Sequence, residues 1–168
     1  MIKKFVPEYY LETFDMASAE FLASIDVKGV VLDVDNTLEP YENPKPTEKV
    51  LLWFESLKKA GIKAAIVSNN DKGRIELFNS DLGLAAYYKS GKPQKKNVLR
   101  AIADMGIEKN EAIFMGDQVF TDVWAAHNAG IRAILVPPIR DKRDLLTRFK
   151  RMLEKPVLKK YWKMKENN

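Results

Sequence analysis

Residues 29–38 read GVVLDVDNTL, so an uncharged run leads directly into two aspartates, Asp33 and Asp35, one residue apart. A short apolar run of this kind is typical of a buried strand. Side chains two positions apart project to the same side of an extended chain. The two carboxylates could therefore share a metal ion, or divide the roles of nucleophile and acid–base catalyst. Taken alone, an Asp-x-Asp pair more often ends a strand in a solvated turn, because short motifs match by chance.

The rest of the body alternates similar apolar runs with amphipathic helical segments. The predicted strands cover residues 29–32, 62–67, 84–88, 112–115 and 131–136. The predicted helices lie between Thr47 and Gly61, over residues 72–78, from Pro93 to Gly106, and over residues 121–129 with Gly130 ending the last. This alternation predicts an α/β fold, a doubly wound parallel sheet with helices on both faces.

Polar side chains follow the predicted strands. Ser68 and Asn69 come directly after the second strand, Lys92 follows the third, and Asp117 follows the fourth with Asp122 shortly beyond it. Each is explained singly by a turn, a cap or a helix N-terminus. Ligands of open parallel sheets bind at the carboxyl ends of the strands. The joint occurrence at successive strand ends therefore favours one site.

Composition narrows the chemistry of that site. The 168 residues include no cysteine and a single histidine, and the net charge is +5. These counts exclude thiolate and multi-histidine metal sites, disulfides and cysteine nucleophiles. Carboxylates, lysine, hydroxyls and a hard metal ion remain. His127 falls within a predicted helix, away from the strand ends, and is expected to pack or face solvent rather than catalyse.

The two ends of the chain differ in character from the body. Residues 140–168 carry eleven Lys/Arg and four Asp/Glu, a net +7 that leaves the rest at −2. We predict one α/β domain over residues 1–139 and a basic amphipathic helical extension over 140–168. That helix either packs on the body or lies on a membrane surface, through its apolar series Leu145, Leu146, Phe149, Met152 and Leu153.

Aromatic residues are concentrated near the N-terminus. We expect them to cover the flank of the sheet, the alternative being a partner surface; they are Phe5, Tyr9, Tyr10, Phe14 and Phe21. No apolar run is long enough to span a membrane, and the first residues lack a secretory signal, so a cytoplasmic protein is expected.

The four motifs together resemble those of the haloacid dehalogenase (HAD) superfamily of phosphatases. They are DVDNT at 33–37, Ser68, Lys92-Pro93 and Gly116-Asp117 with Asp122. More narrowly, the chain resembles the YqeG-type phosphatases of HAD subclass IIIA over roughly residues 1–150. The resemblance implies a HAD-like Rossmannoid fold. Its motifs are separated by 35 residues from Asp33 to Ser68 and 24 from Ser68 to Lys92. Neither gap has room for a lid domain, so the chain is expected to be capless.

The resemblance also implies roles for the motif residues. Asp33 resembles the nucleophile that forms an aspartyl-phosphate, and Asp35 the acid that protonates the leaving oxygen and then activates water. Ser68 would donate to a phosphoryl oxygen, and Lys92 would neutralise charge on the phosphoryl group.

The same resemblance implies a Mg²⁺ site. Its expected ligands are the carboxylates of Asp33 and Asp117 with the main-chain carbonyl of Asp35, because Mg²⁺ prefers oxygen ligands. Asn69 and Asp122 are expected to orient these groups rather than to touch the reacting atoms.

The implied function is Mg²⁺-dependent hydrolysis of a phosphate monoester. Relatives in mitochondria and plastids dephosphorylate phosphatidylglycerophosphate, which suggests a lipid phosphate met at the cytoplasmic face of an anionic membrane. One alternative is a phosphatase-like binding module whose basic tail engages RNA or the ribosome. Another is a receiver-type phospho-switch, which accepts phosphate on a mid-chain strand; the acid pair here lies on the first predicted strand.

Overall fold

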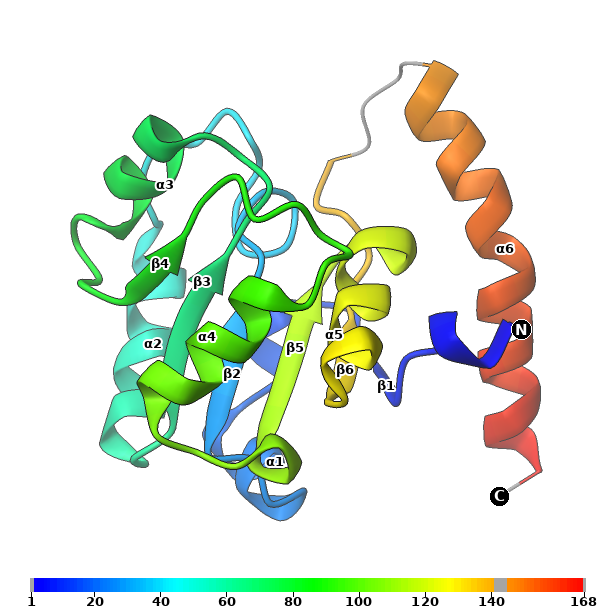
Figure 1. Ribbon diagram of the computed structural model, residues 1–168, viewed down its shortest axis with the longest axis horizontal. Coiled ribbons are helices and arrows are strands. Elements are labelled where there is room, and N and C mark those ends of the chain that lie inside the picture. Colours follow the sequence, from blue (N-terminus) through cyan, green and yellow to red (C-terminus); the bar gives the residue numbers. More distant parts are fainter. Residues whose placement is uncertain (1, 141–144, 168) are drawn as a thin grey trace.

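The computed structural model describes residues 2–140 and 145–167. Residues 141–144 of the predicted C-terminal extension lie outside the described residues. Six strands form one sheet in which every neighbouring pair is parallel, in the order β1-β6-β5-β2-β3-β4 (Figure 1). The strands are β1 (Tyr9–Tyr10), β2 (Gly29–Leu32), β3 (Lys63–Val67), β4 (Ala85–Tyr87), β5 (Ala112–Gly116) and β6 (Arg132–Leu135). The predicted α/β class and parallel sheet are confirmed.

Helices cover both faces of the sheet. The helices are α1 (Ala19–Ser24), α2 (Glu48–Lys59), α3 (Lys72–Asn79), α4 (Lys96–Met105), α5 (Trp124–Ala129) and α6 (Leu145–Glu166). Val30 and Leu32 of β2 pack with α1, α2 and α3, whereas Val31 packs with α4 and α5. This alternation follows from the period of two in a strand. Between β2 and β4, single helices join the strands, and residues 2–140 hold no inserted cap domain.

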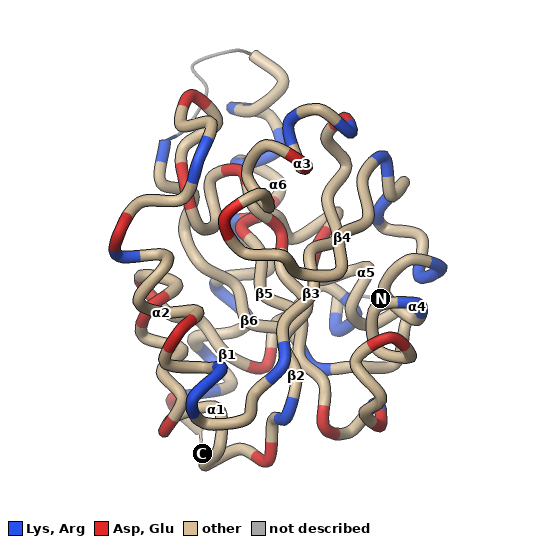
Figure 2. Tube along the Cα trace, turned by 90° about the vertical axis from the view of Figure 1, so that its left-hand side faces the viewer, with Lys and Arg blue, Asp and Glu red and all other residues tan. Residues whose placement is uncertain are grey.

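Short turns complete the path of the chain. They are η1 (Ile2–Phe5), η2 (Phe14–Met16), η3 (Lys109–Glu111) and the π-helical turn η4 (Val119–Val123). Gly106 and Gly130 end α4 and α5 in the left-handed region, as predicted, with φ of 65° and 77°. Figure 2 shows acidic and basic residues interspersed over the side that carries α2 and α3.

Two helix starts differ from prediction. Pro93 does not open α4, which begins at Lys96; Pro93 lies in the preceding turn, after a cis peptide bond with Lys92. The segment predicted as a helix from Thr121 begins instead with η4. There Asp122 accepts a hydrogen bond from the backbone of Gln118 (3.0 Å), so its side chain points back toward the strand end rather than along the helix surface.

The N-terminal aromatic residues cover the edge of the sheet, as expected. Tyr9 and Tyr10 form β1, which pairs with β6, and Phe14 is buried in the core. Phe5 makes edge-on contacts with Phe120 and Trp124. This strand was not predicted, because two residues carry no periodicity.

Helix α6 packs on the body through residues other than the predicted apolar series. Val157 and Tyr161 are buried, and the Tyr161 hydroxyl accepts a hydrogen bond from the backbone of Tyr10 (3.0 Å). The series faces solvent instead, with Leu145 81% and Phe149 54% exposed. In Figure 1 this helix lies beside the N-terminal segment. None of the helices in residues 2–140 and 145–167 has the length and hydropathy needed to cross a bilayer.

Candidate active site

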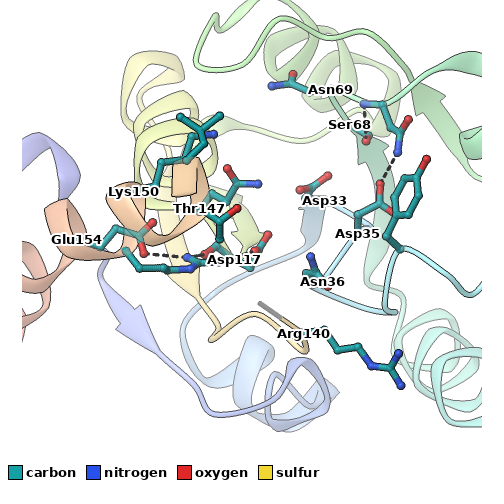
Figure 3. Close-up of a pocket in the computed structure, with 15 residues that line it drawn as sticks. Asp33, Asp35, Asn36, Ser68, Asn69, Asp117, Arg140, Thr147, Lys150 and Glu154 are labelled. Carbon is teal, nitrogen blue, oxygen red and sulfur yellow. Dashed lines mark hydrogen bonds and ion pairs between the residues drawn. The ribbon is translucent and has the colours of Figure 1, made fainter. Parts of the chain in front are cut away.

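A cavity of about 600 Å³ opens at the carboxyl ends of the strands, where parallel sheets bind ligands (Figure 3). Its lining brings together Asp33, Asp35, Ser68, Asn69 and Asp117, which the sequence placed at three separate strand ends. The opposite wall belongs to α6 and includes Thr147, Lys150 and Arg151. The predicted convergence of strand-end residues on one cavity is therefore present.

Lys92 lies between two carboxylates beside this cavity. Its ammonium is 2.7 Å from Asp122 Oδ1 and 3.2 Å from Asp33 Oδ1, and its side chain is 1% exposed. Burial disfavours the charged amine, but the two carboxylates outweigh burial and raise the pKa of Lys92. Burial raises the pKa of Asp33 to about 6, with Lys92 opposing and Asp122 adding to the shift. The single positive charge of Lys92 therefore does not balance the two neighbouring carboxylates, Asp33 and Asp122.

Asp117 adds a third buried carboxylate at the end of β5. Burial raises its pKa well above the usual range, and the charges of Asp122 and Asp33 raise it further. The residue before Asp117 is Gly116, and any larger residue there would place a Cβ atom against the Asp122 carboxylate. One oxygen from each of these three acids lies within 4.8 Å of the others.

This acidic cluster fits a divalent cation. Both oxygens of Asp122 accept short hydrogen bonds, from Lys92 (2.7 Å) and from the Gln118 backbone (3.0 Å), whereas the contacts on the Asp117 carboxylate, from Thr37 and Arg151, are longer at 3.3 Å. Asp33 and Asp117 are the carboxylates of the cluster that line the cavity. Hard oxygen donors that are costly to ionise together match a hard ion such as Mg²⁺.

Asp35 lines the same cavity and is oriented by two side chains. Arg74 Nε and Nη2 donate to Asp35 Oδ1 at 3.0 and 2.9 Å, and Asn70 Nδ2 donates to Oδ2 at 2.7 Å. Sequence reasoning missed Arg74. The available signal was its place in the first turn of the helix that follows Ser68 and Asn69.

Ser68 and Asn69 take different positions after β3. Ser68 is 1% exposed, lines the cavity, and its hydroxyl accepts from the backbone of Asn70 (3.1 Å). Asn69 holds the backbone of Lys92 from both sides, accepting from its N–H (2.7 Å) and donating to its carbonyl (3.3 Å). Asn69 therefore joins the second motif to the third.

Helix α6 contributes three charged residues that sequence reasoning did not place here, Lys150, Arg151 and Glu154. Arg151 Nη1 donates to the Asp117 carbonyl (3.1 Å) and to Glu154 Oε2 (2.8 Å), and Nη2 donates to Asp117 Oδ2 (3.3 Å). Glu154 is buried and accepts from the backbone of Val119 (3.3 Å). In sequence these residues are part of a charge-rich helix, and no local pattern separates them from the other charges.

His127 lies outside the cavity, as expected. Its Nδ1 is 2.6 Å from the Lys4 carbonyl and its Nε2 is 3.2 Å from Glu8. Burial lowers the pKa of His127, but these two acceptors outweigh burial and raise it overall. The residue fastens the N-terminal segment to α5.

Comparison with known proteins agrees with this geometry. A profile of the haloacid dehalogenase-like hydrolase family matches residues 3–136. A probable phosphatase, YqeG, of Bacillus subtilis (strain 168) is 38% identical over 159 residues, which are 94% of this chain and 92% of that relative.

Solved structures share the fold. A HAD phosphatase from Thermococcus onnurineus has a TM-score of 0.55 at 18% identity, over 70% of this chain and 88% of that chain. The cobalt-bound deoxy-D-mannose-octulosonate 8-phosphate phosphatase of Haemophilus influenzae has a TM-score of 0.53 at 16% identity, over 81% of this chain and 90% of that chain.

The motif order, the parallel sheet and the sequence match lead to one conclusion. The chain belongs to the haloacid dehalogenase superfamily and, within it, to the phosphatases of the YqeG type.

Proposed function

We propose that this phosphatase hydrolyses phosphate monoesters with Mg²⁺ through an aspartyl-phosphate. The observation that carries the proposal is the buried Asp33 carboxylate, 3.2 Å from Lys92 at the wall of a cavity that Asp117 also lines. A buried carboxylate next to a fixed cation is suited to attack a phosphoryl group, whose transfer depends on positioning and charge stabilisation.

In the first step an Asp33 oxygen forms a bond to phosphorus while the bond to the leaving oxygen breaks. Asp35 donates a proton to that oxygen, so the alcohol leaves neutral. In the second step Asp35 takes a proton from water, the hydroxide attacks phosphorus, and inorganic phosphate departs from Asp33. Lys92 and the Ser68 hydroxyl hold phosphoryl oxygens throughout.

The carboxylates of Asp33 and Asp117, with the carbonyl of Asp35, would hold Mg²⁺. When bound, the ion neutralises charge on the phosphoryl oxygens. Asp122 keeps Lys92 in place, at 2.7 Å, and Asn69 fixes the lysine backbone. Arg74 and Asn70 keep the Asp35 carboxylate at the cavity wall.

The test of this proposal is a metal-dependent activity screen. A panel of phosphate monoesters, including phosphatidylglycerophosphate in mixed micelles, is assayed with Mg²⁺, with chelator and after Mg²⁺ is restored. We expect hydrolysis that chelator abolishes and Mg²⁺ restores. Hydrolysis that is insensitive to chelator would contradict the metal assignment, and inactivity on every ester would contradict the proposal.

We further propose a lipid phosphate as the substrate. The supporting observation is the exposed apolar side of α6 next to the cavity mouth: Leu146 lines the cavity at 65% exposure, and Leu145, Phe149 and Met152 are 81, 54 and 53% exposed. An amphipathic helix with cations among such residues binds an anionic membrane surface. A capless cavity would then face the bilayer. The alternative of a module that binds RNA or the ribosome has no supporting observation in the described residues or the comparisons.

Point substitutions test the lipid proposal better than truncation, because removing residues 155–168 would also remove the buried Val157 and Tyr161. The variant carries Leu145→Ser, Phe149→Ser and Met152→Ser. We expect weaker co-sedimentation with anionic vesicles and slower hydrolysis of micellar substrate, with unchanged hydrolysis of a soluble ester.

The matched control carries Leu52→Ser and Leu77→Ser, which replace exposed leucines of α2 and α3 (56 and 45% exposed). The membrane assignment would be contradicted if both variants lost vesicle binding equally. It would also be contradicted if hydrolysis of the micellar and the soluble substrate slowed equally.

A further inference from the structure

One face of α6 forms a wall of the catalytic cavity. Thr147, Lys150, Arg151 and Glu154 all line it (Figure 3). Their spacing places them on adjacent turns of one helical face. Val157 and Tyr161, further along, dock the helix on the body. The helix is therefore held by its second half and presents its first half to the site.

Arg151 is anchored firmly on its own helix and extends toward the acidic cluster. Its contact with Glu154 is 2.8 Å, within the range of charge-assisted hydrogen bonds of about 2.7–2.9 Å. Its contacts with the carbonyl and carboxylate of Asp117 are longer, at 3.1 and 3.3 Å. The guanidinium is thus fixed from the helix side and lies against a cavity-lining acid.

The anchor itself is unusual for a docking surface. Glu154 is 5% exposed on the packing face of α6, where an apolar residue would serve helix docking. A buried ion pair adds little to stability relative to apolar packing, because desolvation offsets the attraction. Glu154 holds Arg151 and receives the Val119 N–H. This arrangement is better explained by the placing of a guanidinium at the cavity than by docking.

Three cations line the cavity that a phosphate ester would enter, Arg140, Lys150 and Arg151, and Arg151 contacts the acidic cluster through Asp117. Asp33, Asp35 and Asp117 line the wall and repel a phosphoryl dianion. Lys92 also pairs with Asp33 and Asp122, so this one ammonium does not offset the negative charge of the wall. A guanidinium presents a planar fork of donors that matches phosphoryl oxygens in geometry and charge.

We propose that Arg151 is a substrate-binding residue: its guanidinium contacts the phosphoryl group in the cavity, so that α6 adds a binding group to a site otherwise built from strand ends. The inference rests on the proposed function. It assigns to the C-terminal helix a part in substrate binding in addition to the parts of Lys92 and Ser68.

The test measures binding of inorganic phosphate by calorimetry at saturating Mg²⁺, and binding of Mg²⁺ alone. Arg151→Gln should weaken phosphate binding at least about tenfold, as expected for loss of a hydrogen bond to a charged group. Its Mg²⁺ affinity should stay the same or increase, because a cation next to Asp117 is gone. Arg151→Lys, which keeps the charge without the fork, should lie between wild type and Arg151→Gln. With ester substrate, KM should rise in the same order.

Two controls separate binding from docking. Arg148→Gln removes an exposed arginine that is not among the cavity-lining residues and should leave phosphate affinity unchanged. Tyr161→Phe loosens the docked end of α6 and should also leave it near wild type.

The proposal is overturned if Arg151→Gln binds phosphate as tightly as Arg148→Gln does. It is also overturned if Arg151→Gln lowers Mg²⁺ affinity as much as phosphate affinity, since Arg151 would then only position Asp117. A wild type that hydrolyses esters while Arg151→Gln binds phosphate normally overturns the inference alone. A wild type that neither hydrolyses esters nor binds phosphate overturns the proposed function with it.

Discussion

The two walls of the cavity are fixed in different ways. The strand-end wall is part of the core: Lys92 is 1% exposed on its side chain, and the backbone of Asp33 donates to Met115 on the neighbouring strand (3.1 Å). The α6 wall stands on a helix docked by few buried residues, and its Arg151 side chain is 24% exposed. Figure 3 shows them facing each other.

The difference in packing separates the residues assigned to bond making and metal binding from those assigned to substrate binding. The groups assigned to bond making and metal binding lie where the sheet holds them to fixed positions. The groups that approach from α6 depend on a packed helix, which opens locally at lower free energy than a core strand does. Substitutions in the first wall should therefore affect turnover, and substitutions in the second should affect binding and docking.

The largest effect is expected for Asp33→Asn, because an amide cannot attack phosphorus. Turnover should fall by more than about a thousandfold. The fold should survive, since removing a buried charge relieves desolvation. Initial rates with Mg²⁺ and a thermal melt measure both. Asp104→Asn, an exposed residue of α4, is the matched control. A folded Asp33→Asn variant with near wild-type activity would exclude the covalent mechanism.

Asp117→Asn acts where the two walls meet. It replaces a carboxylate ligand by a neutral amide, so Mg²⁺ affinity should fall by at least about tenfold, as for losses at metal sites. Calorimetric titration with Mg²⁺ gives the constant directly. A wild-type dissociation constant for Mg²⁺ would show that Asp117 is not a ligand. If Arg151→Gln lowered Mg²⁺ affinity as much as Asp117→Asn does, the distinction between the two walls would be lost.

Metal binding at the strand-end wall should depend on pH. The pKa of Asp33 is raised to about 6, so a proton competes with Mg²⁺ below that pH. Apparent Mg²⁺ affinity should therefore fall as the pH is lowered from 7.5 to 5. For the protein without metal the sign is opposite: stability decreases as the pH rises from the ordinary value of 3.8 toward 6, because the folded state must ionise a buried acid. Titrations and melts at several pH values test both, and pH-independent Mg²⁺ affinity would contradict the assignment.

The smallest effect is expected for Tyr161→Phe in the α6 wall. The Tyr10 N–H loses its acceptor, which costs about 1 kcal/mol of helix docking. Hydrogen exchange over residues 157–166 should increase while that of β2 and β5 stays unchanged. Equal increases in the strands would mean that α6 unfolds together with the core rather than separately.

The strand-end wall was predictable from sequence and the α6 wall was not. Buried strands β2 and β5 read as continuous apolar runs, and the polar residues after them are placed by the parallel topology itself. Arg151 reaches the site through tertiary packing, which leaves no spacing signal, and Arg74 is marked in the sequence only by its place in the helix that follows Ser68 and Asn69. The packing of α6 was not predictable either: the apolar series at Leu145 to Leu153 left open whether it packs on the body or lies on a membrane, and the residues that pack on the body are Val157 and Tyr161.

Local backbone detail also lay beyond the pattern. Proline favours the first turn of a helix, but Pro93 belongs to the turn that presents Lys92 to Asp33 and Asp122. The π-helical turn at Val119–Val123 arises where Asp122 points back toward the strand end.

The edge strand β1 has a consequence for the order of folding. Tyr9 pairs with Ile134, and the backbone N–H of Tyr10 donates a hydrogen bond to the hydroxyl of Tyr161, 151 residues away. During synthesis Tyr9 and Tyr10 exist long before either partner, whereas β2 and β3 can pair as soon as residue 67 is made. Contacts between distant residues form slowly because a large loop must close first. We therefore expect β1 to pair with β6 late in folding, so that β6 keeps an open edge until then.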